Sequence, residues 1–164
     1  MKCARGCLAG VFLFSLALTK LATAQAAPDP KQFMSAADID ALIVKAKGMA
    51  KPGQATVNQP LVQLAPYTAS VEYHTEVGLA SVHEQEAELV YVLSGSGTYI
   101  TGGTLAGQKR VNAANLTGTS IDGGTVRNFD KGAIFFVAQG EPHFLSKLQG
   151  PVILLSMHVP RTAP

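Results

Sequence analysis

The hydrophobic and polar positions along the chain form two patterns. Around residue 40, apolar residues recur every three or four positions, whereas after Pro60 short apolar runs alternate with turn residues. The first spacing is typical of one face of a helix, and short runs rich in Val, Ile, Tyr and Phe are typical of strands. We therefore expect an all-β domain preceded by one amphipathic helix.

The helix is predicted to begin after Ser35, which suits an N-cap, with Asp38 in the first turn, where a negative charge is favourable. Four apolar residues follow at helical spacing: Ile39, Leu42, Ile43 and Ala46. Gly48 and Pro52-Gly53 end the run. This helix is expected to pack against the outside of the main domain.

Short apolar runs predict strands at 61–64, 70–74, 79–83, 89–93, 98–101, 133–137 and 152–158, and a further strand is expected to start at His143. Gly95-Ser96-Gly97 is interpreted as a tight hairpin turn between two of them. Many short strands with glycine turns and no alternating helices favour a sandwich or barrel. The stretch from Gly102 to Gly132 shows little apolar periodicity, so we expect a long loop there, either a functional lid or an irregular excursion.

The first two dozen residues have the pattern of a secretory signal peptide. Met1-Lys2 and Arg5 give a positive start, and an apolar run, 8–18, follows. Ala22-Thr23-Ala24 offers the small residues of a cleavage site, although cleavage after Ala26 is nearly as suitable. The apolar run is shorter than the roughly 20 residues of a membrane-spanning helix. A secreted or periplasmic location is therefore expected.

The predicted organisation is a signal peptide (1–24), a leader and N-terminal helix (25–59) and one β-barrel domain (60–164). Cleavage would remove both cysteines, Cys3 and Cys7, and three of the 13 basic residues, which leaves 10 against 11 acidic ones. Such a chain has no basic surface excess for nucleic acid and no thiolate for a metal or a nucleophile. After cleavage, no association with nucleic acid or membranes is expected.

The candidate chemistry lies in the histidines, which number four in the whole chain: His74, His83, His143 and His158. Glu88 follows His83 after a short turn and opens a strongly apolar strand, where a carboxylate is unfavourable unless it is paired or bound to a cation. Two imidazoles with one carboxylate suit Fe, Mn, Zn, Ni or Cu. His83, Glu88 and His143 are therefore the predicted ligands of one divalent metal ion.

These segments resemble the two motifs of the cupin superfamily. The first motif runs Gly, five residues, His-x-His, three or four residues, Glu, six residues, Gly; its second half is matched by His83, Glu88 and Gly95. The second runs Gly, five residues, Pro-x-Gly, two residues, His, three residues, Asn, and it is matched by Gly132, Gly140 and His143. The resemblance covers roughly residues 79–147. It implies a single-domain jelly-roll β-barrel that holds a divalent metal in its interior.

The chain departs from these motifs at four positions: Thr75, Ser81, Ala138 and Lys147. Cupins usually present three histidines and one glutamate, and Ser81 stands where the first histidine is expected. An alternative register makes His83 the first ligand and Gln85 the second, but it leaves one residue too few before Glu88. Ser81 is therefore interpreted as a vacant position that could hold a metal-bound water.

Several residues are candidates to complete the site or line the pocket. His74 or Gln85 could replace the missing ligand, and His158 is a further candidate, although a buried structural histidine is the alternative interpretation. Tyr91 is expected to line the barrel, together with Tyr73, Phe136 and Phe144. Arg110 and Arg127, in the 102–132 stretch, are candidates to recognise an anionic substrate over the mouth, or else belong to a solvated loop.

Two functions remain open from the sequence. One is a metal-dependent enzyme, of oxidoreductase or lyase type, that acts on a small polar or carboxylate-bearing substrate; the resemblance allows dioxygenase, decarboxylase, isomerase or lyase chemistry. The other is a non-catalytic cupin that binds a small ligand and has lost full metal coordination, which the serine at position 81 favours. A homodimer paired through outer strands such as Leu61–Leu64 is a further expectation.

Overall fold

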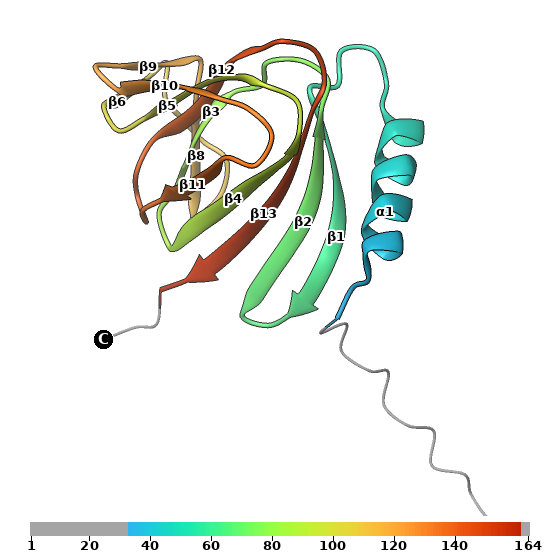
Figure 1. Cartoon of the computed structure of the whole chain (residues 1–164). Helices are drawn as coiled ribbons and strands as arrows, with labels where there is room; N and C mark the ends of the chain where they lie inside the picture. The colour runs from blue at the N-terminus through green and yellow to red at the C-terminus, as the bar shows by residue number, and fades with distance from the viewer. Residues whose placement is uncertain (1–32, 162–164) are drawn as a thin grey trace, which may run out of the picture.

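The computed structural model describes residues 33–161, which form one helix, α1 (Ala36–Met49), and thirteen strands. The predicted signal peptide and most of the predicted leader lie outside these residues. Within residues 33–161, no helix has the length and apolar character needed to cross a bilayer. The expected all-β fold with a single N-terminal helix is confirmed (Figure 1).

The strands form two main antiparallel sheets. The first has the order β1 (Thr56–Leu64), β2 (Tyr67–His74), β13 (Val152–Pro160), β4 (Glu86–Ser94) and β11 (Ile134–Val137). The second has the order β10 (Thr125–Phe129), β5 (Gly97–Thr101), β12 (His143–Leu148), β3 (Ala80–His83), β8 (Asn115–Gly118) and β7 (Lys109–Arg110). A small third sheet pairs β6 (Thr104–Ala106) with β9 (Ser120–Asp122).

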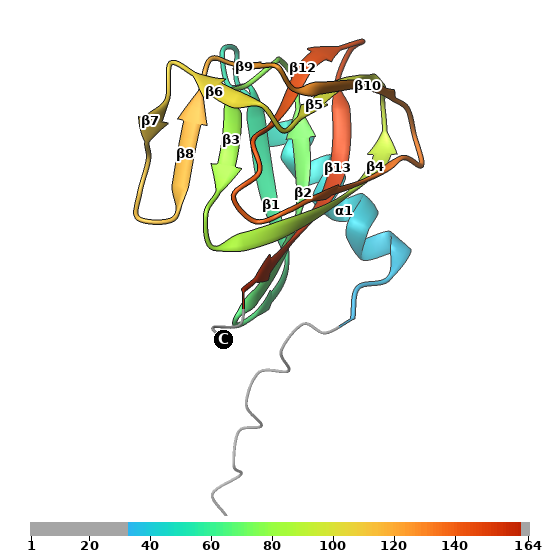
Figure 2. The same ribbon diagram turned by 90° about the vertical axis from the view of Figure 1, so that its left-hand side faces the viewer.

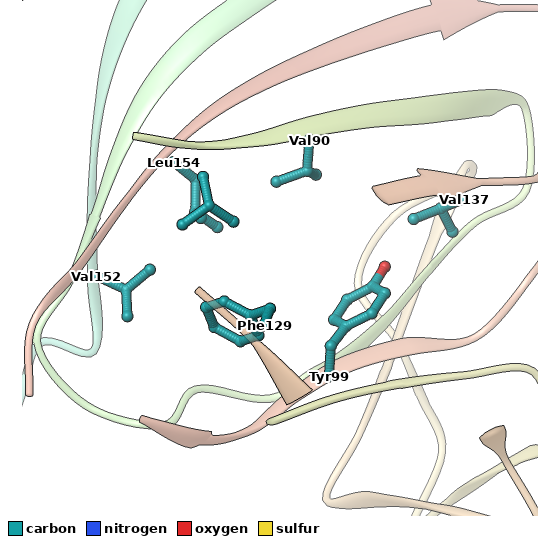
Figure 3. Close-up of a cluster of buried hydrophobic side chains, with 7 residues drawn as sticks. Val90, Tyr99, Phe129, Val137, Val152 and Leu154 are labelled. Carbon is teal, nitrogen blue, oxygen red and sulfur yellow. The ribbon is translucent and has the colours of Figure 1, made fainter. Parts of the chain in front are cut away.

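The two main sheets pack face to face around an apolar core. Val90, Val152 and Leu154 come from the first sheet, whereas Tyr99 and Phe129 come from the second, and all are at least nine-tenths buried. Figure 3 shows the aliphatic side chains on one side of this core and the two rings on the other. Such a two-sheet antiparallel barrel is a jelly roll. The cupin resemblance is therefore confirmed at the level of the fold.

Strand alternation places polar residues at one end of this core. On β4, Glu88, Val90 and Val92 are buried, and on β13 the inward series is Val152, Leu154, Ser156 and His158. Successive side chains of a strand point to opposite faces. Glu88 and His158 therefore share the barrel interior, beyond the apolar part of the core.

Helix α1 covers the outer face of the first sheet at β1 and β2 (Figure 1). Ser35 caps it as predicted, since its Oγ accepts from the Asp38 N–H (3.2 Å) and the Asp38 carboxylate accepts from the Ser35 N–H (2.9 Å). Ile39 and Leu42 pack with Leu61, Ala69, Val71 and Ile153. Leu61 is thus buried beneath the helix, and of the segment expected to support a dimer (61–64) only Gln63 and Leu64 are exposed.

Two expectations about the connections were wrong. Gly95-Ser96-Gly97 is not a hairpin turn, because β4 and β5 belong to different sheets; the segment carries the chain from one sheet to the other. A Cβ at Gly97 would collide with the Lys147 carbonyl oxygen, so the glycine allows a close backbone approach. A glycine-rich turn alone does not reveal whether the strands beside it pair.

The stretch from 102 to 132 is also ordered into strands, β6 to β10, rather than one long loop. Leu105, Leu116 and Ile121 from this stretch are buried with Val82 and Phe144. Figure 2 shows β7 and β8 extending the second sheet beside β3. These strands have two to five residues, too few positions for an alternating pattern to stand out in the sequence.

Candidate metal centre

Four side chains from four strands meet in the barrel interior. His83 ends β3 and His143 begins β12 in one sheet, whereas Glu88 on β4 and His158 on β13 come from the other. His143 Nε2 lies 3.2 Å from Glu88 Oε2, and His83 Nε2 lies 3.7 Å from the same oxygen. His158 Nε2 lies 3.9 Å from Glu88 Oε1. The three imidazoles thus surround one carboxylate.

The carboxylate of Glu88 is buried and only partly satisfied. Its side chain is 7% exposed, and its Oε1 accepts a hydrogen bond from Ser156 Oγ at 2.5 Å. Its Oε2 has no hydrogen-bond partner among the described residues, although two Nε2 atoms lie close to it. A buried ionised oxygen without a donor is unfavourable unless a cation occupies the space before it.

The second nitrogen of two of the imidazoles, those of His83 and His143, is hydrogen-bonded to an acceptor. His83 Nδ1 donates to Asn115 Oδ1 at 2.7 Å, and His143 Nδ1 donates to the Glu141 carbonyl oxygen at 3.4 Å. His158 Nδ1 lies 2.8 Å from Glu86 Oε1. This nitrogen of His158 is close to Glu86 but forms no hydrogen bond among the described residues. Because Nδ1 of His83 and of His143 faces an acceptor, the proton of these two rings is placed there and their Nε2 lone pairs face Glu88. Ligating histidines are held in this way.

The electrostatics of the cluster keep Glu88 and His83 in the forms that bind metal. Burial would raise the pKa of Glu88, but its contact with His143, the Ser156 hydroxyl and the nearby His158 lower that pKa to about 2. Burial lowers the pKa of His83 below its ordinary value, against the opposing effect of the Asn115 hydrogen bond. Glu88 is therefore ionised and His83 neutral at pH 7, as metal ligands must be.

The geometry of the cluster fits a divalent ion. His83, Glu88 and His158 each offer a ligand atom within 4.8 Å of the other two, and His143 approaches the same carboxylate. Nitrogen and oxygen ligands about 2.1 Å from a metal are roughly 3–4 Å apart, so small side-chain shifts would close this set on one ion. A set of imidazoles with one carboxylate suits Fe, Mn, Zn, Ni or Cu.

The cluster opens into a cavity of about 520 Å³ between the two sheets. Its lining includes all four clustered residues, and also Ser81 and His74. Ser81 lies opposite His143 in the register of β3 and β12, so the position where cupins usually have a histidine does face the site. The third imidazole nevertheless comes from His158, at the other side of the barrel.

The remaining candidates lie in different surroundings. Both ring nitrogens of His74 are engaged away from the cluster, one 3.1 Å from Thr56 Oγ1 and the other 2.9 Å from Glu72 Oε2. Gln85 and Tyr91 do not line the cavity. Tyr91 is 39% exposed because it alternates with the inward-facing Glu88 and Val90 on β4, which corrects the expectation that it lines the barrel.

Three other expected roles are also corrected or narrowed. Phe136 is exposed on the outer face of β11 rather than in the barrel. Arg110 forms an exposed ion pair with Glu84 (2.6 Å), and Arg127 donates to Thr101 Oγ1 (3.3 Å). Neither arginine lines the cavity. The cavity wall therefore contains no lysine or arginine for an anionic substrate among residues 33–161.

The sequence leaves two interpretations of His158, a further site residue or a buried structural histidine. The structure places it in the cluster, 3.9 Å from Glu88 Oε1. The signal that could have identified it is the alternation Leu154, Ser156, His158, in which the inward face of an apolar strand becomes polar at its end. The same change occurs on β4, where Glu88 precedes Val90 and Val92. Fold and site together define a cupin-like barrel with a candidate centre of three histidines and one glutamate.

No protein-family model and no curated protein matches the sequence. Among solved structures, HppE in its FeII form is similar to 64% of this chain at 17% identity with a TM-score of 0.49, and this match spans 51%, about half, of the HppE chain. The cupin domain of Schizosaccharomyces pombe Cnp3 is similar to 66% of this chain, over 63% of its own, at 18% identity and a TM-score of 0.45. KdgF from Halomonas sp. is similar to 69% of this chain, over 87% of its own, at 14% identity and a TM-score of 0.47.

Proposed function

We propose that this protein is an exported cupin that binds one divalent first-row metal ion through His83, Glu88, His143 and His158 and acts on a small molecule in its barrel. The observation that carries the proposal is the arrangement around Glu88. Three Nε2 atoms approach a buried carboxylate whose Oε2 lacks a donor, and the Nδ1 atoms of His83 and His143 are held by acceptors. The export part rests on the pattern of residues 1–24 alone.

The donor set supports an enzyme more than it supports a metal-free binding module. The vacancy at Ser81 was the reason to favour a cupin that has lost its metal. His158 supplies a third imidazole from β13, so four ligands are available without Ser81. A metal bound here would act as a Lewis acid or a redox centre toward a small substrate.

The chain's own residues define what can react. The two sheets and their apolar core surround the cluster, and the cavity of about 520 Å³ beside it has the size of a site for a small molecule. Asn115 and the Glu141 carbonyl group hold two imidazoles, those of His83 and His143, in the tautomer that ligates. We propose an oxidoreductase or lyase of this kind, in keeping with the cupin resemblance of the sequence.

Metal analysis of the protein purified without chelator tests the proposal. We expect close to one first-row metal ion per chain, and loss of most of it in the Glu88→Gln and His143→Ala variants. His74→Ala is the matched control, because His74 lines the same cavity but bonds to Thr56 and Glu72 instead. Unaltered protein that neither contains metal nor takes it up on dialysis would overturn the proposal.

A further inference from the structure

The cavity has a second polar region, away from the candidate metal centre. Glu72 and His74 on β2 and Thr56 on β1 line it. His74 Nε2 lies 2.9 Å from Glu72 Oε2, and His74 Nδ1 lies 3.1 Å from Thr56 Oγ1. The second carboxylate oxygen of Glu72, Oε1, has no hydrogen-bond partner among residues 33–161. An acceptor is therefore available to a molecule in the cavity.

Sheet register separates this region from the metal centre. On β13, His158 is opposite Glu88 and Leu154 is opposite Glu72. These two positions are four residues apart, which corresponds to about 13 Å along a strand. Between them the cavity wall includes the apolar Val90 and Phe135, and the inward-facing Ser156 of β13 is bonded to Glu88. The cavity is therefore elongated, with a polar group at each end.

The charges at the two ends differ in sign once a metal is bound. A divalent ion held by one carboxylate and neutral imidazoles is a net positive site, whereas the other end has the carboxylate of Glu72. Among the described residues, no Lys or Arg lines the cavity, and Arg110 is paired with Glu84 outside it. A second anionic group on a ligand would thus meet the Glu72 carboxylate with no lysine or arginine to pair with.

Tyr99 provides an independent hydrogen-bonding group for a polar ligand in the cavity. Tyr99 is only 4% exposed and lines the cavity. Its hydroxyl has no hydrogen-bond partner among the described residues. Figure 3 shows this hydroxyl pointing into the space between the sheets, toward Val137. A buried hydroxyl without a partner is unfavourable, so a ligand oxygen that accepts a hydrogen bond from Tyr99 would remove this desolvation penalty.

We propose that the cavity selects a small ligand with two different polar groups; this inference rests on the proposed metal centre. One group is an anionic oxygen group that binds the metal, and the other is a hydrogen-bond donor, a hydroxyl or an ammonium, that binds Glu72. Tyr99 donates to an oxygen of the same ligand. Ligands with an anionic group at each end, such as dicarboxylates, are disfavoured because their second charge would meet Glu72. This narrows the expected carboxylate-bearing substrates to those with a single anionic group.

Calorimetry with the metal-loaded, full mature chain tests the inference with two matched series of probes. The probes are straight-chain ω-amino carboxylates and α,ω-dicarboxylates of four to eight carbons. At the best chain length, the amino carboxylate is expected to bind about tenfold or more tightly than the dicarboxylate, as for a hydrogen bond to a charged group. Glu72→Gln should abolish this preference, whereas Glu76→Gln, an exposed carboxylate outside the cavity, should retain it.

Tyr99→Phe separates the two contacts. It is expected to weaken both series about threefold to tenfold, through loss of one hydrogen bond, without changing the preference between them. Metal content, measured first in every variant, should equal that of the unaltered protein. A protein without metal overturns the proposed function itself. Three results with metal-loaded protein overturn this inference alone: equally tight binding of dicarboxylates and amino carboxylates, no binding of either series, or an unchanged preference in Glu72→Gln.

Discussion

His158 on β13 lies directly opposite Glu88 on β4, and its Nε2 is 3.9 Å from Glu88 Oε1. Two residues 70 positions apart in the chain thus form a cross-strand pair inside the barrel. This pair brings a third imidazole to the centre from a strand outside both cupin motifs. It also explains how the centre can do without a histidine at position 81.

Replacing His158 should weaken the metal centre more than replacing Ser81. We expect His158→Ala to lower the affinity for Zn²⁺ or Co²⁺ at least tenfold, because it removes a ligand and leaves three. Ser81→Ala should change the affinity less than threefold, since Ser81 lies opposite His143 but its hydroxyl forms no hydrogen bond with the cluster among residues 33–161. Competition titration with a coloured chelator measures both. Equal losses in the two variants would contradict this account of the fourth ligand.

Asn115 is expected to act through His83. Its Oδ1 accepts the Nδ1 proton of His83, and its own amide donates to Asn112 Oδ1 at 3.1 Å, which fixes the direction of the side chain. Asn115→Ala should lower metal affinity about tenfold to 100-fold, as is usual for residues that orient a ligating histidine. Asn115→Asp keeps the acceptor and should recover most of the affinity. An alanine variant with unchanged affinity would show that His83 needs no such support.

The metal-free protein should lose stability as the solution becomes acidic. The pKa of His83 is lowered in the folded state by burial, so below its ordinary value of 6.5 the unfolded chain takes up a proton more readily. The contribution of His83 to the free energy of unfolding is therefore present above pH 6.5 and falls as the pH decreases. Urea unfolding of the metal-free protein between pH 7.5 and 5.5 measures this.

A variant isolates that contribution. His83→Gln cannot titrate in this range, so its free energy of unfolding should depend less steeply on pH than that of the unaltered protein. The carboxylate of Glu88, with a pKa of about 2, remains ionised throughout. If both proteins lost stability at the same rate between pH 7.5 and 5.5, burial of His83 would not be the cause.

Gly97 should resist substitution because it lies where two backbones meet. A Cβ there would collide with the Lys147 carbonyl oxygen and contact the ring of Phe129. Gly97→Ala is expected to destabilise the fold by about 1–3 kcal/mol, the usual range for overpacking. Gly48→Ala is the control, since a Cβ at Gly48 would meet nothing within 4 Å and alanine favours the helix. Thermal or urea unfolding that finds the two variants equally stable would contradict the crossing of β4 into β5.

Local sequence patterns predicted the parts of the fold that depend on near neighbours. The capped helix after Ser35, most strands and the convergence of His83, Glu88 and His143 follow from spacing within short segments. The short strands of the 102–132 stretch did not stand out, because they have too few positions to alternate visibly.

The contribution of His158 depends on information that no single segment contains. Its inward direction could be inferred from the alternation with Ser156, but its position opposite Glu88 depends on the register between β13 and β4. For the same reason the glycines at 95 and 97 were misinterpreted, since pairing of the strands they connect is a property of the whole barrel. Register between distant strands is set by packing, which a local pattern does not encode.

The most direct test of the central claim is X-ray absorption spectroscopy of the protein loaded with one equivalent of Zn²⁺ or Co²⁺, which counts imidazole ligands. We predict a first coordination shell of nitrogen and oxygen atoms with the signature of three imidazoles, reduced to two in His158→Ala. A shell with two imidazoles in the unaltered protein, or a spectrum that His158→Ala leaves unchanged, would contradict a centre built from His83, Glu88, His143 and His158.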